Sequence, residues 1–205
     1  MQSLRHPSAL SVPASSKDAK VFRVVVLPWT RYVVFFGLAT FGSAVDLLSK
    51  YWVFRWRGLP RHDNVWWIWE PFVGIETAVN TGALFGMGAG NGRFFAILSI
   101  AAAVGILIWL FYARAATDLW LTVALGCVTA GILGNLYDRL GLWIQADTPA
   151  AWHSAVRDWI LFRYGSFTWP NFNVADSLLV SGAAMLMWHA AREQPQTTAQ
   201  SANAG

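Results

Sequence analysis

Long apolar stretches alternate with polar connections along this chain, and four of the stretches are long enough to form membrane-spanning helices. They cover approximately residues 32–54, 94–113, 119–136 and 174–190. A helix needs roughly 17 to 25 residues to cross about 30 Å of hydrocarbon, and each stretch meets that length. The pattern therefore predicts an all-α membrane protein with a bundle of four transmembrane helices.

The two long connections differ from the spans because short apolar and polar stretches alternate within them. In loop 55–93, Pro71 separates the apolar stretches 65–69 and 72–79, and several glycines lie within or after the second stretch. Alternation interrupted by Gly and Pro is typical of short strands joined by turns. We expect loop 55–93 to form a small, partly β lobe on the membrane surface, and loop 137–173 to form a second region of this kind.

Both ends of the chain are polar, and we expect them to be disordered tails over residues 1–30 and 192–205. The first tail lacks a compact apolar segment followed by a small-residue cleavage site, so we do not expect a cleaved signal peptide. An even number of spans puts both tails on one side of the membrane. The basic first tail places that side in the cytoplasm, and the two long loops of the membrane domain 31–191 then lie on the extracytoplasmic side.

Composition supports the membrane location and narrows the partners. Of the 205 residues, 56% are hydrophobic and only 13% are charged, and the mean hydropathy is +0.41. These values are too apolar for an ordinary soluble domain. The net charge is +4, but the basic residues do not cluster with aromatic ones, so we expect anionic lipid headgroups rather than nucleic acid as partners.

Disulfide and metal chemistry have little support in the sequence. The single cysteine, Cys127, lies within an apolar stretch, and we expect it to be a packing residue. His153 and Asp158 could supply two metal ligands, but a catalytic zinc site usually has three protein ligands.

A pair of opposite charges lies within the first span. Asp46 and Lys50 are four positions apart, so they share one helix face and can form an ion pair. Charged groups inside a span are expensive unless they are paired or functional. The pair could be structural or could help to hold an active site. It could also mark an ion path, which would make the protein a small ion- or proton-coupled carrier. A non-catalytic membrane scaffold is a further alternative for the function of the protein.

Two further motifs place polar groups near the same end of the spans. Asn80, followed by Thr81 and Gly82, could bring donors close to a substrate peptide, although a tight turn held by the Asn side chain fits equally well. At the end of the third span, Asn135 and Arg139 share a helix face. The third span also carries Gly131 and Gly134, whose spacing allows close helix approach.

Three carboxylates follow or flank the last spans. Asp138 lies beside Arg139, whose charge should keep it ionised, so we expect Asp138 to be a structural partner. Asp158 and Asp176 could act as acid and base in peptide hydrolysis, because two nearby carboxyl groups tend to share one proton. The alternatives are a helix N-cap for Asp176 and a surface salt bridge from Asp158 to Arg157 or Arg163.

Taken in order along the four spans, these motifs resemble the family of bacterial lipoprotein signal peptidases, also called signal peptidase II. The resemblance covers roughly residues 30–190. The residues that carry it are Asp46 with Lys50, Asn80-Thr81-Gly82-Ala83 with Phe85, Gly134-Asn135-Leu136 with Asp138-Arg139, and Phe172-Asn173-Val174-Ala175-Asp176-Ser177.

The resemblance implies an aspartic endopeptidase of the bacterial inner membrane that works without a metal or cofactor. Its substrates would be diacylglyceryl-modified prolipoproteins, cut just before the lipidated cysteine, and we expect it to act as a monomer among membrane lipids. The family's catalytic pair falls on Asp158 and Asp176. Its substrate-contacting residues fall on Asn80, Asn135, Arg139 and Asn173, and its supporting positions on Asp46, Lys50, Gly82 and Asp138.

The sequence departs from the family pattern between the third and fourth spans. The stretch from Leu140 to Arg157 carries an insertion of about ten residues, and Asp158 is followed by Trp159 where the family usually has Phe. Asp147, before Pro149, is therefore a competitor for the first catalytic position. The spacing to Asp176 favours Asp158.

Overall fold

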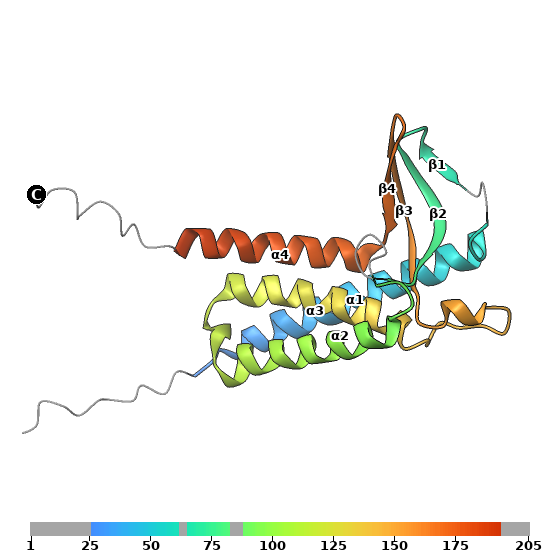
Figure 1. The fold of residues 1–205 in the computed structure, drawn as a ribbon. Coiled ribbons are helices and arrows are strands. Elements are labelled where there is room, and N and C mark those ends of the chain that lie inside the picture. Colours follow the sequence, from blue (N-terminus) through green and yellow to red (C-terminus); the bar gives the residue numbers. More distant parts are fainter. Residues whose placement is uncertain (1–25, 62–64, 83–87, 194–205) are drawn as a thin grey trace, which may run out of the picture.

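A computed structural model describes residues 26–61, 65–82 and 88–193 of the chain (Figure 1). Most of the two expected tails lies outside the described residues, as do Ala83 and Phe85 of the motif before the second span. The described part contains four long helices and one four-stranded sheet.

All four expected spans are helices that are long and apolar enough to cross a membrane. Their bounds are α1 Trp29–Arg57, α2 Gly92–Leu107, α3 Leu119–Arg139 and α4 Val174–Glu193, and a π-helical segment, Ile108–Tyr112, continues α2. Helix α1 begins directly after Pro28 and ends at Arg57, before Gly58, whose φ of 80° is a conformation that glycine adopts easily. Helix α3 begins after Asp118, whose side chain accepts a hydrogen bond from the Leu121 N–H at 3.0 Å.

Helix α3 packs against the other three helices and is the most buried of the four. Glycines allow this close packing. A Cβ on Gly131 would meet the carbonyl oxygen of Ala175 and would lie 2.6 Å from Leu179 Cγ in α4. In the opposite direction, a Cβ on Gly182 of α4 would lie 2.6 Å from Val128 Cγ2 in α3. The small residues of these helices therefore set the distance between them.

The outer faces of the bundle are apolar. Phe41 of α1, Ile97 of α2 and Val180 of α4 are each more than 60% exposed. Lipid tails are as apolar as these side chains, so such surfaces suit a hydrocarbon environment.

The two long loops meet in one antiparallel sheet with the strand order β1-β2-β3-β4. Strands β1 Trp66–Trp69 and β2 Val73–Asn80 come from the first loop, and β3 Val156–Tyr164 and β4 Phe167–Phe172 come from the second. We expected two partly β regions, and the structure joins them because β2 pairs with β3, with Ala78 opposite Asp158.

The sheet stands at the end of the bundle where α1 ends and α4 begins (Figure 1). The segment between α3 and β3 holds a short 3₁₀ turn, Ala150–Trp152, and a buried Trp143. Strand β3 follows this segment, and β4 leads directly into α4. The sheet therefore places β3 and the start of α4 at the same end of the bundle.

Candidate active site

Asp158 and Asp176 come together at the junction of the sheet and the bundle. Asp158 lies in β3 and is 2% exposed, whereas Asp176 lies in the first turn of α4 and is half-buried. Asn173, directly before α4, is completely buried between them.

Asn173 contacts both carboxyl groups. Its Nδ2 donates to Asp158 Oδ1 at 2.6 Å, and its backbone N–H donates to Asp176 Oδ2 at 3.2 Å. In return, its Oδ1 accepts a hydrogen bond from the Asp176 N–H at 2.9 Å. Asn173 is thus the N-cap of α4, and Asp176, three residues later, reaches back to it as in a capping box. The alternative of Asp176 as the N-cap is therefore wrong by three positions.

Asn135 of α3 holds the other oxygen of Asp176. Its Nδ2 donates to Asp176 Oδ1 at 2.8 Å. Its Oδ1 accepts hydrogen bonds from Lys50 Nζ at 2.9 Å and from Asn173 Nδ2 at 3.2 Å. Asn135 therefore connects Asp176 to the charged group in α1.

The ion pair expected within the first span is present. Lys50 Nζ lies 2.7 Å from Asp46 Oδ2, and both side chains are fully buried. The second oxygen of Asp46 accepts a hydrogen bond from the Ala175 N–H at 2.9 Å. Because Ala175 is in the first turn of α4, the pair attaches the start of α4 to α1 and does more than neutralise two charges.

Asp138 is buried in an ion-pair network, but its partners differ from the neighbour that we expected. It lies 3.2 Å from Lys50 Nζ and 2.7 Å from Arg157 Nη2. Consecutive residues of a helix point in different directions, so Arg139 is directed away from it. Asp138 therefore has charged partners within the fold, but the choice of Arg139 as one of them was wrong, and the supporting role of Asp138 stays a prediction.

Arg139 points instead toward the turn after β2. Its Nη2 donates to the carbonyl oxygen of Gly82 at 2.8 Å, and the guanidinium carbon lies 5.0 Å from the centre of the Phe95 ring. The Gly82 N–H in turn donates to Asn80 Oδ1 at 2.9 Å. The tight turn held by Asn80 is therefore present. Within the described part of the chain, Arg139 Nη1 is buried without a hydrogen-bond partner.

Asp158 is not in a surface salt bridge. It is buried, Arg157 pairs with Asp138, and Arg163 lies over the Trp67 ring at 5.1 Å. Burial raises the pKa of Asp158 well above its ordinary value, and the negative charge of Asp176 raises it further, against the opposing effects of the Asn173 hydrogen bond and Lys50.

Asp147 lies apart from this pair. It is exposed and lines a cavity of about 540 Å³ between α1, the end of α3 and the segment after it. His153 contacts the carbonyl oxygen of Thr148 at 3.4 Å. Among the described residues there is no group of three or more His, Cys, Asp or Glu side chains that could hold a metal ion.

Two contacts of the site were not predicted from the sequence. They are the ion pair of Arg157 with Asp138 and the hydrogen bond from the Ala175 N–H to Asp46. The alternation of side chains along a strand could have separated Arg157 from Asp158, because neighbouring residues project to opposite faces. The Ala175 contact left no sequence signal, since every residue except proline supplies a backbone N–H.

Four apolar helices and a pair of carboxyl groups connected by one amide define the class as a multi-pass membrane protein with an aspartic-peptidase type of site. The family model described as signal peptidase (SPase) II matches residues 38–192. The chain belongs to the signal peptidase II family of aspartic peptidases, as its resemblance in sequence predicted.

Individual relatives agree with this assignment. The chain is 58% identical to a lipoprotein signal peptidase of Rhodopirellula baltica over 161 residues, which cover 78% of this chain and 72% of the relative. It is 35% identical to a lipoprotein signal peptidase of Polynucleobacter necessarius over 64% of this chain and 75% of the relative. The fold also matches a solved bacterial membrane enzyme, with a TM-score of 0.66 and 24% identity over 80% of this chain and 90% of that one.

Proposed function

We propose that Asp158 and Asp176 are the catalytic pair of a lipoprotein signal peptidase that cuts diacylglyceryl-modified prolipoproteins just before the lipidated cysteine. The single observation that carries the proposal is the position of Asn173, which contacts both carboxyl groups. Family membership supplies the reaction class, the removal of signal peptides from prolipoproteins.

The environments of the two carboxyl groups suggest different roles. Asp158 is buried and its pKa is raised, which suits the carboxyl group that gives a proton to the carbonyl oxygen of the scissile bond. Asp176 is half-buried and accepts hydrogen bonds on both oxygens, which suits the carboxylate that takes a proton from the attacking water. As the tetrahedral intermediate collapses, the C–N bond breaks, Asp176 passes the proton it received to the leaving amine, and a hydroxyl of the intermediate returns a proton to Asp158.

Four polar residues around the pair are proposed to position the substrate: Asn80, Asn135, Arg139 and Asn173. Arg139 has a specific reason for this role, because its Nη1 is buried and has no partner among the described residues. A substrate carbonyl would satisfy that donor. The Gly82 carbonyl holds the other terminal nitrogen and so aims the guanidinium.

The supporting residues are proposed to keep the helices in register. Asp46 and Lys50 attach α1 to α4 and to Asn135, and Asp138 attaches α3 to β3. In this proposal Gly82 supports Arg139, and none of these residues exchanges protons with the substrate.

The membrane setting that we propose puts both termini in the cytoplasm and the site near the extracytoplasmic face of the bacterial inner membrane. Residues 31–191 form the peptidase domain, which works as a monomer among lipids. Exposed tryptophans near the sheet, including Trp56, Trp66 and Trp69, suit an interface between hydrocarbon and water. A diacylated substrate would remain in the bilayer and present its peptide bond at that level.

The test is cleavage of a diacylglyceryl-modified prolipoprotein by purified wild type and by Asp158→Asn, Asp176→Asn and Asp147→Asn, each checked for folding. Loss of one acid or base should lower the rate by about 10²- to 10⁴-fold. We expect this loss for the first two variants and wild-type cleavage for Asp147→Asn. Normal cleavage by Asp158→Asn together with loss in Asp147→Asn would move the first catalytic position to Asp147.

A further inference from the structure

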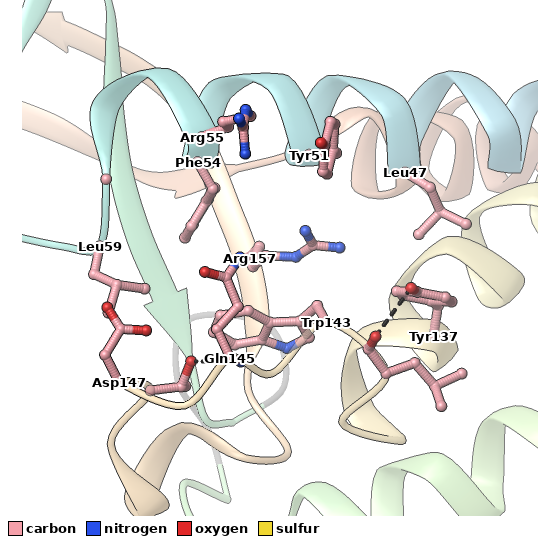
Figure 2. A pocket seen from close by; sticks show the side chains of 13 residues that line it. Leu47, Tyr51, Phe54, Arg55, Leu59, Tyr137, Trp143, Gln145, Asp147 and Arg157 are labelled. Carbon is pink, nitrogen blue, oxygen red and sulfur yellow. Dashed lines mark hydrogen bonds between the residues drawn. The ribbon is translucent and has the colours of Figure 1, made fainter.

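Arg157 directly precedes Asp158 in β3 and projects to the opposite face of the strand. Asp158 bonds Asn173, whereas Arg157 bonds Asp138 of α3. Figure 2 shows the Arg157 guanidinium at the cavity of about 540 Å³, opposite Phe54 of α1 and near Trp143. The Arg157 side chain is therefore outside the site in which Asp158 acts, while the Arg157 carbonyl oxygen accepts a hydrogen bond from Asn173 Nδ2 at 3.3 Å.

We propose that Arg157 is a positioning residue for Asp158, because it fastens β3 to the end of α3 and so keeps Asp158 against Asn173. This inference rests on the proposed function, in which Asp158 is catalytic.

The attachment uses both the backbone and the side chain of Arg157. Its backbone N–H donates to Asp138 Oδ2 at 3.0 Å, while Nε and Nη2 donate to Asp138 Oδ1 at 3.0 and 2.7 Å. Both side chains are almost completely buried, so removal of one leaves the buried charge of the other without this partner. The position of the strand is thus coupled to one carboxylate in the last turn of α3.

Aromatic rings hold the guanidinium from further directions. Its central carbon lies 5.3 Å from the centre of the Trp143 ring and 5.9 Å from that of Phe54. Trp143 Nε1 donates to the carbonyl oxygen of Ala155 at 3.2 Å, close to the start of β3. A planar guanidinium can stack on rings and bind a carboxylate with two nitrogens, which a lysine cannot do. Arg157→Lys should therefore keep the charge but lose part of the geometry.

The charge of Arg157 also affects Asp176, the other carboxyl group of the pair, through a series of polar contacts. Asp138 is shared by Arg157 and Lys50, and Lys50 donates to Asn135, which holds Asp176. Without the charge of Arg157, Lys50 alone would neutralise both Asp46 and Asp138. We expect its hydrogen bond to Asn135 to weaken as a result.

A second consequence concerns the proton on Asp158. The charged groups that face it are Asp176 from α4, Lys50 from α1, and Asp138 and Arg139 from α3. Strand β2 places the uncharged Ala78 opposite it. An Asp138 without its guanidinium partner adds uncompensated negative charge, which should raise the pKa of Asp158 further. The alkaline limb of the pH–rate profile should then move to higher pH.

The experiment measures kcat and KM for a diacylglyceryl-modified prolipoprotein, and the pH profile of kcat, in wild type, Arg157→Met and Arg157→Lys. Small misplacement of a reacting group costs on the order of 10- to 100-fold in rate. We expect Arg157→Met to lower kcat by about that factor, with KM within about threefold and the alkaline limb at higher pH. For Arg157→Lys we expect a loss of about three- to tenfold, with the limb unmoved.

Arg163→Met is the matched control, because Arg163 is in the same strand and lies over a tryptophan ring, in contrast to the carboxylate pairing of Arg157. We expect its kcat to stay close to that of wild type. Folded Arg157→Met with wild-type kcat and pH profile would overturn the proposal, as would an equal loss in Arg163→Met. If Arg157→Met does not fold, Arg157→Lys decides: reduced kcat with unchanged KM supports the positioning role, and wild-type kcat overturns it.

Asp158→Asn, measured in parallel, separates this inference from the proposed function. If Asp158→Asn cleaves normally, the catalytic assignment fails and the positioning role fails with it. If Asp158→Asn is inactive while Arg157→Met has wild-type kcat, the catalytic assignment stands and only the positioning role is overturned.

Discussion

At the scale of single residues, Asn173 combines a structural and a chemical position. As the N-cap of α4 it accepts the Asp176 N–H, and with its amide nitrogen it donates to Asp158. An amide is suited to this place because it offers an acceptor and donors on one rigid group. An aspartate there would offer only acceptors when ionised and would add a third negative charge.

Asn173→Ala should therefore affect cleavage more strongly than stability. Loss of an N-cap costs about 0.5–2 kcal/mol, while misplacement of the proposed pair should lower kcat/KM by about 100-fold. Thermal unfolding in lipid–detergent mixtures and cleavage kinetics measure the two effects. Asn171→Ala is the control, because Asn171 bonds Glu76 of β2 and does not contact the pair. Equal losses of activity in the two variants would contradict the special position of Asn173.

The raised pKa of Asp158 predicts a pH dependence of stability. Burial raises its pKa above the reference of 3.8, so its contribution to stability is fully present below that value and is lost as pH rises through the raised pKa of the folded state. Asn does not titrate, so Asp158→Asn does not lose stability in this way as pH rises. We expect the variant to unfold at a higher temperature than wild type at alkaline pH, and the difference to shrink as pH falls. An unfolding temperature that differs by the same amount at every pH would contradict this prediction.

At the scale of secondary-structure elements, close packing around α3 determines where the polar groups meet. Gly134 leaves room for the Asp46 carboxylate, since a Cβ there would contact Asp46 Oδ2. Gly131 similarly allows α4 to approach near Ala175. Helix termini that lie this close can share polar groups across three helices.

Gly131→Leu should push α4 away from α3. Overpacking of a close contact costs about 1–3 kcal/mol, and we expect a lower unfolding temperature together with reduced cleavage. Gly105→Leu is the control, because a Cβ on Gly105 of α2 has no neighbour within 4 Å. Equal stability of the two variants would contradict the role given to the α3–α4 contact.

At the scale of the whole molecule, the sheet and the site lie at the same end of the bundle, opposite the connection between α2 and α3 (Figure 1). The proposed orientation therefore has a direct test. Ser166 lies in the turn between β3 and β4. In a Cys127→Ala background, the thiol of Ser166→Cys should react with a membrane-impermeant reagent in spheroplasts, whose inner membrane is intact. The thiol of Thr117→Cys, between α2 and α3, should react only after the membrane is permeabilised. The reverse pattern would mean that the protein has the opposite orientation.

Much of this protein could be predicted from local pattern. Span length and hydrophobicity are properties of contiguous residues, so the four helices were predicted to within a few positions at most ends. The ion pair of Asp46 and Lys50 was also predictable, because four positions on a helix fix their relative geometry. The order of polar motifs on the spans was enough to indicate the family.

Only the tertiary structure decided which polar groups meet across elements. Asp138 is paired with Arg157 rather than with its neighbour Arg139, and the two loops form one sheet rather than two regions. Both outcomes depend on the directions in which elements face one another after packing, and the short-range sequence pattern carries no information on those directions. The sequence by itself determined the spans and the chemical groups available. The fold determined their partners, because burial away from water forces each charged group to find one.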